Sequence, residues 1–457
     1  MSNSQLNLFW SIVVSSIAVG ALFGALLTQY MAEKFGRRNA LIISGVFNVI
    51  GAFLEYFAKS LNSPEVLIIG RLILGGNIAL SCGLVPMYLM EISPTRYRGA
   101  AGTAHQTAVA FSDWFAKFVG LPEILGGTNS WPIAYGFPGI LALFLCIILP
   151  FCPKSPKFTL ITKGQKSEAE KDLHRFMDKD EAERTLLALN KEAESIEATG
   201  TLKELFTTKE LRYPLFISIW MMVAQTYTGS GAVFAYSTDM LVSAGMSAPV
   251  ARWSTIGIGV AYFICACSAT YLIERLGRRF LAIFQLGTVT IALSLISITA
   301  WLKSATQSVW LGYVTIALFL VYMCVYGVGS PIPWMISGEI FPTKFRPTAM
   351  TVTVFASFIN SFLISLLYLP FKQAVGVSLS YLPFIIVSAI STVIVYFLLP
   401  ETRNRTSKEI TEGMASRKFS LIQDSPKRSN SSAFEETPLI NRDNIQFNAY
   451  YSTINDK

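Results

Sequence analysis

Eleven apolar stretches, each long enough to cross a lipid bilayer, constrain the fold of this chain more than any other feature of its sequence. A helix needs about 20 predominantly apolar residues to span the hydrocarbon core. Charged residues make up only 14% of the 457 residues, against about 25% in soluble domains. The stretches begin near Leu8, Ala40, Val66, Gly99, Trp131, Tyr213, Val250, Phe280, Val309, Pro347 and Leu379. Because the bilayer core holds no water to satisfy backbone polar groups, the chain is predicted to be an all-α polytopic membrane protein.

Three charged signatures occur twice, at nearly the same separation along the chain. The pairs are Glu33 to Arg38 with Glu274 to Arg279, Glu91 to Arg98 with Glu339 to Arg346, and Pro153 to Pro156 with Pro400 to Thr402. Such a duplication predicts two similar helical bundles. Two apolar stretches precede Glu274 but only one precedes Glu33, so we expect the first bundle to lack one helix. An alternative start or an incomplete gene model would give the same pattern.

The basic residues of the loops predict the orientation of the chain. One set of loops is rich in Lys and Arg, whereas the alternate set offers only Lys59, Arg252, Lys303 and Lys372. Basic loops stay in the cytoplasm, so the C-terminus is expected there as well. The membrane is expected to be the plasma membrane, with an endosomal or lysosomal membrane as the alternative. The net charge of +8 then reflects topology, and we expect no nucleic-acid partner.

The pattern of polar and apolar segments divides the chain into four predicted parts. They are an N-terminal bundle lacking one helix (1–153), a cytoplasmic helical linker (154–212), a six-helix bundle (213–400) and a disordered cytoplasmic tail (401–457). The tail is rich in Ser, Asn and charge, a composition that cannot bury a core.

Neither enzymatic chemistry nor a cofactor is indicated. The six cysteines lie in or beside apolar stretches and match no zinc spacing, so no metal is expected. We find no nucleophile–base pair, and no Gly-x-x-x-x-Gly-Lys-Ser/Thr string that would bind ATP. The chain is therefore predicted not to be an enzyme.

A set of short strings resembles the facilitative glucose transporters of animals, in the sugar-transporter branch of the major facilitator superfamily. They include Lys34-Phe-Gly-Arg-Arg-Asn39, Glu91-Ile-Ser-Pro-Thr95, Gly102-Thr-Ala-His-Gln106, Ala232-Val-Phe-Ala-Tyr-Ser-Thr238, Pro331-Ile-Pro-Trp334 and Pro400-Glu-Thr402. Each string alone is weak, but their order and spacing are specific from Leu8 to about Ile410. The resemblance implies a twelve-helix fold, alternating access and a sugar site between the bundles.

The resemblance also implies roles for individual residues. Gln106, Gln225 and Trp334 would contact the sugar, with Trp334 as an apolar plate against its ring. Phe234 and Tyr236 fall in the outer-gate segment, and Gly327, Gly329, Pro331 and Pro333 are expected to weaken or break the helix before Trp334. The gating residues at the inner helix ends would be Arg37, Arg38, Glu91, Arg98, Glu274, Arg278, Arg279, Glu339 and Arg346. Their interhelical ion pairs would hold the bundles closed inside, unless the arginines only fix topology.

Several positions depart from the family pattern. Thr226 stands where a second Gln is typical, Gly231 and Tyr262 where Asn is, and Tyr326 where an acid is; Ser357 replaces a third Asn, with Asn360 one turn away. We include Thr226, Gly231, Ser357 and Asn360 among the candidate substrate-binding residues. Each mismatched buried polar group costs about 1–3 kcal/mol, which weakens the expectation of glucose. Lys154 also stands where an acid is usual, so one inner ion pair is expected to be lost.

Two acid–base pairs lie in or beside apolar stretches. Asp113 is seven residues beyond Gln106 and faces the same side of its helix. As an intramembrane acid it is a candidate for selecting the substrate or binding a proton. The alternative is that Asp113 and Lys117 form a self-satisfying i,i+4 pair. Glu55 and Lys59 are expected to form a similar pair at an outer helix end.

Three functions stay open at the level of the sequence. The first is passive uniport of a hexose or related polyol, and the second is proton-coupled sugar symport, for which Asp113 is the available acid. The third is a non-transporting relative that acts as a receptor or regulator. The expected partners are the sugar, the lipid bilayer and, through sorting patterns at 435–440 and 451–454 in the tail, clathrin adaptors.

Overall fold

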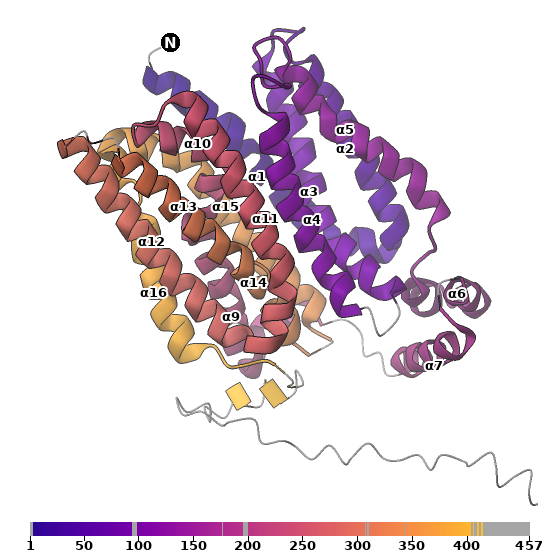
Figure 1. The fold of residues 1–457 in the computed structure, drawn as a ribbon. Coiled ribbons are helices and arrows are strands. Elements are labelled where there is room, and N and C mark those ends of the chain that lie inside the picture. The colour runs from indigo at the N-terminus through magenta and orange to yellow at the C-terminus, as the bar shows by residue number, and fades with distance from the viewer. Residues whose placement is uncertain are drawn as a thin grey trace, which may run out of the picture. The chain divides into compact units, whose positions relative to one another are not determined.

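The computed structural model describes residues 3–93, 98–175, 177–194, 200–306, 308, 310–342, 344–403, 405, 409–410 and 413–414. All of them belong to one unit that ends at Ser416. The described residues are predominantly helical and include no strand, which confirms the all-α prediction (Figure 1). The sorting patterns at 435–440 and 451–454 lie outside the described residues.

Within the described residues, eleven helical spans occupy the positions of the eleven apolar stretches. They are α1 (Asn3–Lys34), α2 (Arg37–Phe57), α3 (Pro64–Ile92), α4 (Arg98–Val119), α5 (Trp131–Ile148), the broken span α9 (Lys209–Gln225), η4 (Thr226–Ser230) and α10 (Gly231–Ser243), α11 (Ala248–Leu276), α12 (Arg278–Thr306), α13 (Trp310–Gly329) with α14 (Ile332–Glu339), α15 (Arg346–Leu379) and α16 (Leu382–Leu398). Eight spans in the described part are individually long and apolar enough to cross a membrane. Of the other three, α4 carries charge, α9 to α10 is interrupted and α16 is short.

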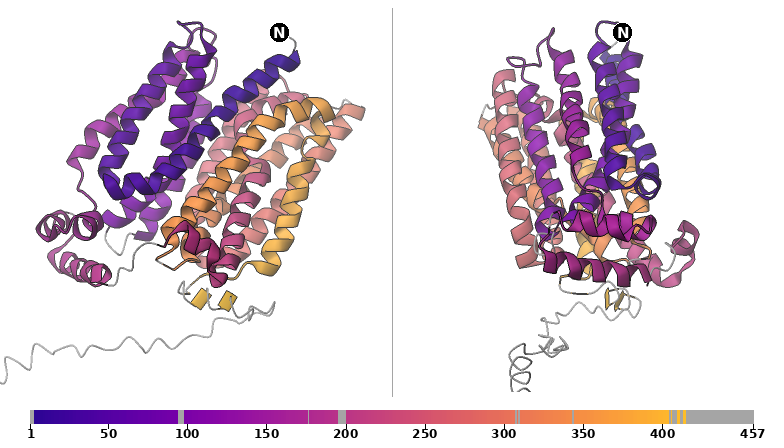
Figure 2. Two further views of the ribbon diagram at one scale, coloured as in Figure 1. Left: turned by 180° about the vertical axis from the view of Figure 1, so that it is seen from behind. Right: turned by 90° about the vertical axis from the view of Figure 1, so that its right-hand side faces the viewer.

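The helices fall into two groups, here called the first half (α1 to α5) and the second half (α9 to α16). In the first half α3 packs against α1, α2 and α4, and α5 packs against α2; in the second half α12 packs against α13 and α16. The halves meet where α1 lies along α15 and α4 lies along α11, the former visible from behind in Figure 2. The exact domain boundaries given above stay a prediction.

One glycine in each half explains the repeated Gly-Arg-Arg signature. Gly36 separates α1 from α2 with φ 80° and ψ 161°, and Gly277 separates α11 from α12 with φ 88° and ψ 161°. This backbone region is essentially restricted to glycine. The chain therefore reverses direction at the same position of both halves, and places two arginines at the start of the next helix.

The segment between the halves is helical, as expected. It contains η2 (Leu149–Phe151), η3 (Phe158–Thr162), α6 (Lys166–Leu173), α7 (Lys179–Glu194) and α8 (Leu202–Thr207). The next span, α9, already begins at Lys209, inside the range 154–212 that was predicted for the linker. A capping box of Thr201 and Glu204 starts α8. Just before it, the Gly200 carbonyl accepts a hydrogen bond from the Thr348 hydroxyl at 2.7 Å.

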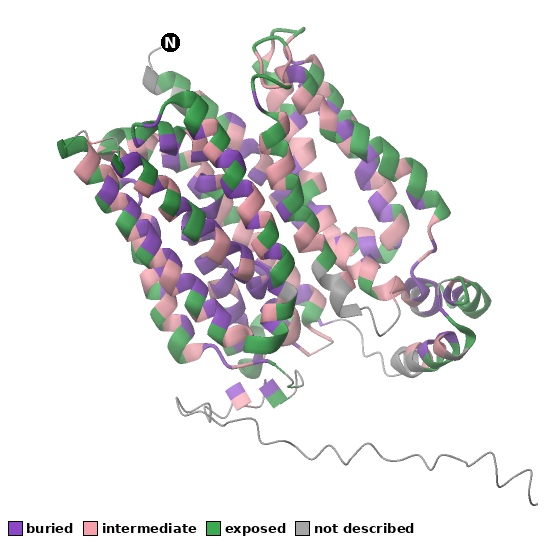
Figure 3. Ribbon diagram, viewed as in Figure 1, coloured by how far each residue is buried: buried purple, intermediate pink, exposed green. Residues whose placement is uncertain are grey.

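Many large apolar side chains are exposed, and the helices carry exposed residues, green in Figure 3, along much of their length. Phe53, Phe144 and Ile291 have 57% to 63% of their surface exposed. In water such a distribution would be unfavourable over so many residues. In a bilayer these side chains contact lipid, while the polar residues described next face the interior between helices.

Candidate functional site

Two interrupted helices of the second half shape the centre of the molecule. α13 ends at Gly329 and α14 begins at Ile332, so the break predicted before Trp334 is confirmed. A second break lies at η4, where Gly229 has φ 81° between α9 and α10. This second break was not predicted, although Thr228-Gly-Ser-Gly231 carries the signal: two glycines within four residues of an apolar helix.

Gln106 and Ser330 meet across the two halves. The Gln106 Nε2 atom in α4 donates a hydrogen bond to Ser330 Oγ at 3.2 Å. Ser330 lies in the break between α13 and α14 and is buried. Gln106 therefore lies at the boundary between the halves and has a hydrogen-bond partner in the second half. Ser330 was not among the predicted residues.

Gln225 is the last residue of α9, directly beside the second break, and its side-chain oxygen also takes part in a hydrogen bond. Its Oε1 atom accepts a hydrogen bond at 3.0 Å from Nε2 of the buried Gln285 in α12. A Cβ atom at Gly329 would lie only 2.1 Å from Gln285 Oε1, so glycine is required there. Gln285 was not predicted as a site residue, although a lone glutamine inside an apolar stretch is the kind of signal that marks a buried polar contact.

The other predicted substrate-binding residues have mixed surroundings. Trp334 in α14 and Ser357 in α15 are partly buried. A Cβ atom on Gly231 would have no neighbouring atom within 4 Å, so this glycine borders open space. The Thr226 hydroxyl and the Asn360 amide donate to carbonyls of their own helices, at 2.8 Å to Met222 and 2.7 Å to Ala356.

Asp113 and Lys117 form the i,i+4 ion pair that was the alternative interpretation. Their Oδ2 and Nζ atoms are 2.6 Å apart, and both side chains are largely buried. Lys117 Nζ also lies 5.1 Å from the ring centroid of Phe234 in α10, so the pair connects α4 to the second half.

The expected pair of Glu55 and Lys59 is wrong. Glu55 is buried beside Arg71 of α3, with Oε1 and Nε 3.8 Å apart, and Arg71 donates a hydrogen bond to the Tyr135 hydroxyl at 2.8 Å. Lys59 instead donates to the Thr128 carbonyl at 2.7 Å. The i,i+4 rule fails here because α2 ends at Phe57, so Lys59 lies beyond the regular helix.

The same three-residue cluster occurs at the charged end of each half. Arg37 pairs with Glu91 at 2.9 Å, and the Ser155 hydroxyl donates a hydrogen bond to the Glu91 carboxylate. In the second half the counterparts of these three residues repeat the arrangement. Arg278 pairs with Glu339 at 3.0 Å, and the Thr402 hydroxyl donates to Glu339 at 2.5 Å. Each of these two ion pairs joins helices of one half. The predicted ion pairing between the halves stays a prediction.

The remaining gating residues have separate surroundings. Arg38 donates to the Cys152 carbonyl and Arg279 to the Tyr396 carbonyl, each at 2.8 Å. Glu274 is exposed at the end of α11, and the Arg346 guanidinium lies 3.5 Å from the Phe341 carbonyl oxygen. The side chain of Arg98 lies outside the described residues.

In the predicted outer gate, Tyr236 is buried and stacks on Tyr368, with 5.4 Å between ring centroids.

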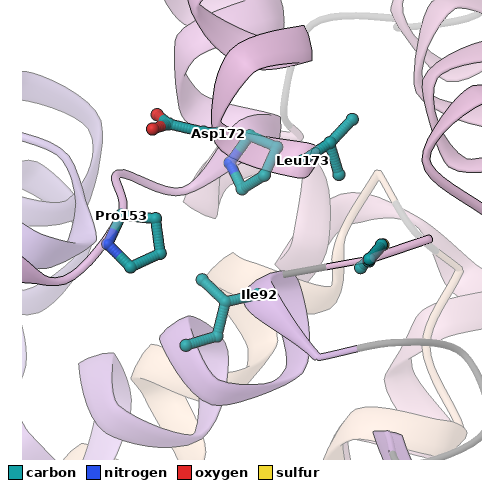
Figure 4. Close-up of a pocket in the computed structure, with 6 residues that line it drawn as sticks. Ile92, Pro153, Asp172 and Leu173 are labelled. Atoms are coloured by element: carbon teal, nitrogen blue, oxygen red, sulfur yellow. The ribbon is translucent and has the colours of Figure 1, made fainter. Parts of the chain in front are cut away.

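The linker packs against the charged end of the first half. Ile92 at the end of α3 lines a small pocket with Pro153, Asp172 and Leu173 (Figure 4). Burial raises the pKa of Asp172, against the opposing attraction of Lys154 and Arg38. Lys154 itself pairs with Glu168 of α6 at 3.2 Å. Lys154, where the resemblance implied an acid, thus forms an ion pair within the linker.

A family model and curated sequences match almost the whole described part of the chain. The family model described as "Sugar (and other) transporter" matches residues 1–414. Solute carrier family 2, facilitated glucose transporter member 3 of sheep (Ovis aries) is 36% identical over 413 residues, 90% of this chain and 83% of that protein. The chicken (Gallus gallus) protein of the same name is 31% identical over 449 residues, 98% of this chain and 88% of its own length.

Solved structures show a similar fold. The xylose transporter XylE from E. coli superposes with a TM-score of 0.74 at 21% identity, covering 90% of both chains. Another structure of the same transporter gives a TM-score of 0.71 at 22% identity, covering 89% of this chain and 90% of that one.

Proposed function

The chain belongs to the sugar transporter family of the major facilitator superfamily, and on that premise we propose that it carries a hexose or related polyol passively across a membrane by alternating access. The observation that carries this proposal is the contact of Gln106 with Ser330 between the halves. A polar contact at that boundary, beside two broken helices, is the arrangement expected of a midplane substrate site. The facilitated glucose transporters among its relatives support a sugar as substrate.

In this proposal Gln106, Gln225 and Trp334 contact the sugar, with Thr226, Gly231, Ser357, Asn360 and Asp113 around it. Trp334 supplies an apolar face and the two glutamines supply donors and acceptors for hydroxyl groups. The breaks at Gly229 and at Ser330 let α10 and α14 move relative to α9 and α13. Phe234 and Tyr236 on α10 would then form the outer gate.

We propose uniport rather than symport because the carboxylate of Asp113 already has a partner. Lys117 Nζ lies 2.6 Å from it, so the carboxylate is neutralised without taking up a proton. The charged loops and the C-terminus are proposed to face the cytoplasm, and the plasma membrane is the proposed location. The clusters of Glu91 and Glu339 are proposed to stabilise one state of the inner gate, because a modest ion pair can bias a two-state equilibrium.

Uptake of labelled glucose and fructose by transporter-deficient cells tests the proposal. The chain is expected to give saturable uptake that falls at least tenfold in Trp334→Ala at matched surface level. Exposed Trp253, on the outward face of α11, provides the control variant Trp253→Ala, which should leave uptake unchanged. Specific sugar binding without flux would instead support the receptor, and absence of both would contradict a sugar substrate.

A further inference from the structure

The two glutamines expected to contact the sugar form hydrogen bonds through opposite atoms of their side-chain amides. Gln106 uses its nitrogen, because Nε2 donates to Ser330 Oγ at 3.2 Å. Gln225 uses its oxygen, because Oε1 accepts from Gln285 Nε2 at 3.0 Å. The oxygen and the nitrogen of an amide lie on opposite sides of one planar carbon. A bond through one of these atoms therefore turns the other atom away from the bonded partner.

The bond between Gln106 and Ser330 has a defined direction. A serine hydroxyl carries one proton, and that of Ser330 donates to the Gly327 carbonyl at 3.4 Å. Toward Gln106 the Ser330 oxygen therefore acts as an acceptor, at a buried position with 2% exposure. This arrangement keeps the Gln106 nitrogen on the Ser330 side and turns Oε1 of Gln106 away from it.

Packing defines the direction of the bond between Gln285 and Gln225. Gln285 is 3% exposed and Gln225 is 8% exposed, and α12, which carries Gln285, packs along α13 (Figure 1). A Cβ atom on Gly329, the last residue of α13, would lie 2.1 Å from Oε1 of Gln285 and 2.3 Å from its Cδ. The Gln285 oxygen thus lies against Gly329, while its nitrogen bonds the Gln225 oxygen.

The break between α13 and α14 therefore orients both amides. Gly329 and Ser330 are consecutive residues there: Gly329 leaves room for Gln285, and Ser330 accepts from Gln106. A site built to hydrogen-bond a hydroxyl strongly rejects an analogue that lacks it. The orientation of each amide decides whether the site needs the proton of that hydroxyl or its lone pair.

We propose that Ser330 and Gln285 are positioning residues that fix the two amides in opposite senses, so that Gln106 presents its oxygen to the sugar and Gln225 its nitrogen. This inference rests on the proposed sugar transport and specifies how that site selects its substrate. One hydroxyl of the sugar donates its proton to Gln106, and another accepts a proton from Gln225. Fluorine accepts a hydrogen bond weakly and donates none, so its substitution for each hydroxyl distinguishes the two contacts.

Competition by glucose analogues tests the inference. Deoxy and deoxyfluoro derivatives at each hydroxyl-bearing carbon in turn compete with the uptake of labelled glucose by transporter-deficient cells. At the carbon facing Gln225, hydrogen should weaken competition about tenfold and fluorine only about twofold, since fluorine still accepts a hydrogen bond. At the carbon facing Gln106, hydrogen and fluorine should both weaken competition about tenfold, since neither donates a proton.

Two variants assign each carbon to its glutamine. Ser330→Ala lets the Gln106 amide turn its nitrogen toward the sugar, so the fluorinated analogue at that carbon should gain about fivefold relative to glucose. Gln285→Met keeps a side chain of similar size but donates no hydrogen bond to Gln225. A glucose hydroxyl can then use either atom of the Gln225 amide, whereas fluorine can use only the nitrogen. The fluorinated analogue tolerated by the unaltered protein should therefore fall behind glucose in Gln285→Met.

Thr290→Val is the matched control. It removes from α12 a side-chain hydrogen bond of 2.9 Å to Ser388, which involves neither glutamine, and it should leave the order of the analogues unchanged. An unchanged order in both Ser330→Ala and Gln285→Met, at measured surface level, would overturn the inference.

The unaltered protein tests the inference even where a variant fails to reach the cell surface. Glucose uptake with no carbon at which fluorine replaces the hydroxyl better than hydrogen does would overturn the inference and leave the transport proposal standing. Absence of any sugar uptake by the unaltered protein would reject the transport proposal, and this inference with it.

Discussion

Glu401 follows α16 in the chain, and its carboxylate lies beside the first residues of α12. Its Oε1 atom accepts a hydrogen bond of 3.0 Å from the backbone N–H of Arg278. Its Oε2 atom accepts a second one, of 3.1 Å, from the N–H of Arg279. A carboxylate at this position satisfies orphan donors of the helix and interacts favourably with its dipole. In the first half the corresponding position is Lys154, which pairs with Glu168 instead. The two halves thus share the ion-pair cluster but not the acidic cap.

Glu401→Gln is expected to lower the stability of the second half by about 1 kcal/mol, because a charge-assisted cap is replaced by a neutral one. The thermal unfolding midpoint of the purified protein in detergent measures this change. Glu168→Gln removes an exposed partner of Lys154 and should shift the midpoint very little. Equal midpoints for Glu401→Gln and the unaltered protein would contradict the capping role.

Reversal of charge at Glu91 should prevent the first half from folding normally. Glu91→Arg would set two cations beside each other in a partly buried site, at a cost of about 3 kcal/mol or more. Exchange of both charges, in Arg37→Glu with Glu91→Arg, is expected to recover a measurable part of the surface expression. Surface biotinylation compares the variants. A double variant no better than Glu91→Arg would show that the pair does not contribute as a pair.

Arg71 is expected to matter more for stability than Glu55 does. Arg71→Met would leave the buried Glu55 carboxylate without a cation, which costs about 3–5 kcal/mol. Glu55→Gln introduced into Arg71→Met removes that charge and should restore most of the unfolding midpoint. Thermal unfolding of the single and double variants forms a double-mutant cycle. Additive effects would show that the 3.8 Å approach carries no interaction energy.

Asp113→Asn tests whether the intramembrane acid selects the substrate. The variant leaves Lys117 as an unpaired cation beside Phe234, so relative uptake of glucose and fructose is expected to change at equal surface level. Asp113→Asn with Lys117→Met removes both charges and controls for the unpaired cation. An unchanged substrate range and an unchanged pH dependence of uptake in Asp113→Asn would contradict a functional role and leave a structural pair.

Local patterns predicted much of the fold, and non-local contacts account for most of what was missed. The helix positions followed from hydrophobic length, and the repeated Gly-Arg-Arg strings anticipated the turns at Gly36 and Gly277. The partner of Gln106 could not be predicted, because Ser330 lies 224 positions away and only the packing of the halves brings them together. Gln285 was missed for the same reason.

The pairing of Glu55 shows the opposite limitation, where a local rule was applied beyond its range. Spacing of four residues pairs side chains only inside a regular helix, and α2 ends between Glu55 and Lys59. The residues of the two gating clusters were predicted, but which acid pairs with which base was not. Their chain positions indicate the ends of helices, whereas the choice between pairing within a half and pairing between halves depends on tertiary packing.

Counterflow in proteoliposomes tests passive sugar transport most directly. Vesicles loaded with unlabelled glucose and diluted into labelled glucose should accumulate label transiently, without any imposed ion gradient, and an imposed proton gradient should not raise the peak. This result is predicted because the intramembrane acid is already neutralised by Lys117. Label that accumulates only under a proton gradient, or that never exceeds the level of empty vesicles, would contradict passive transport by this chain.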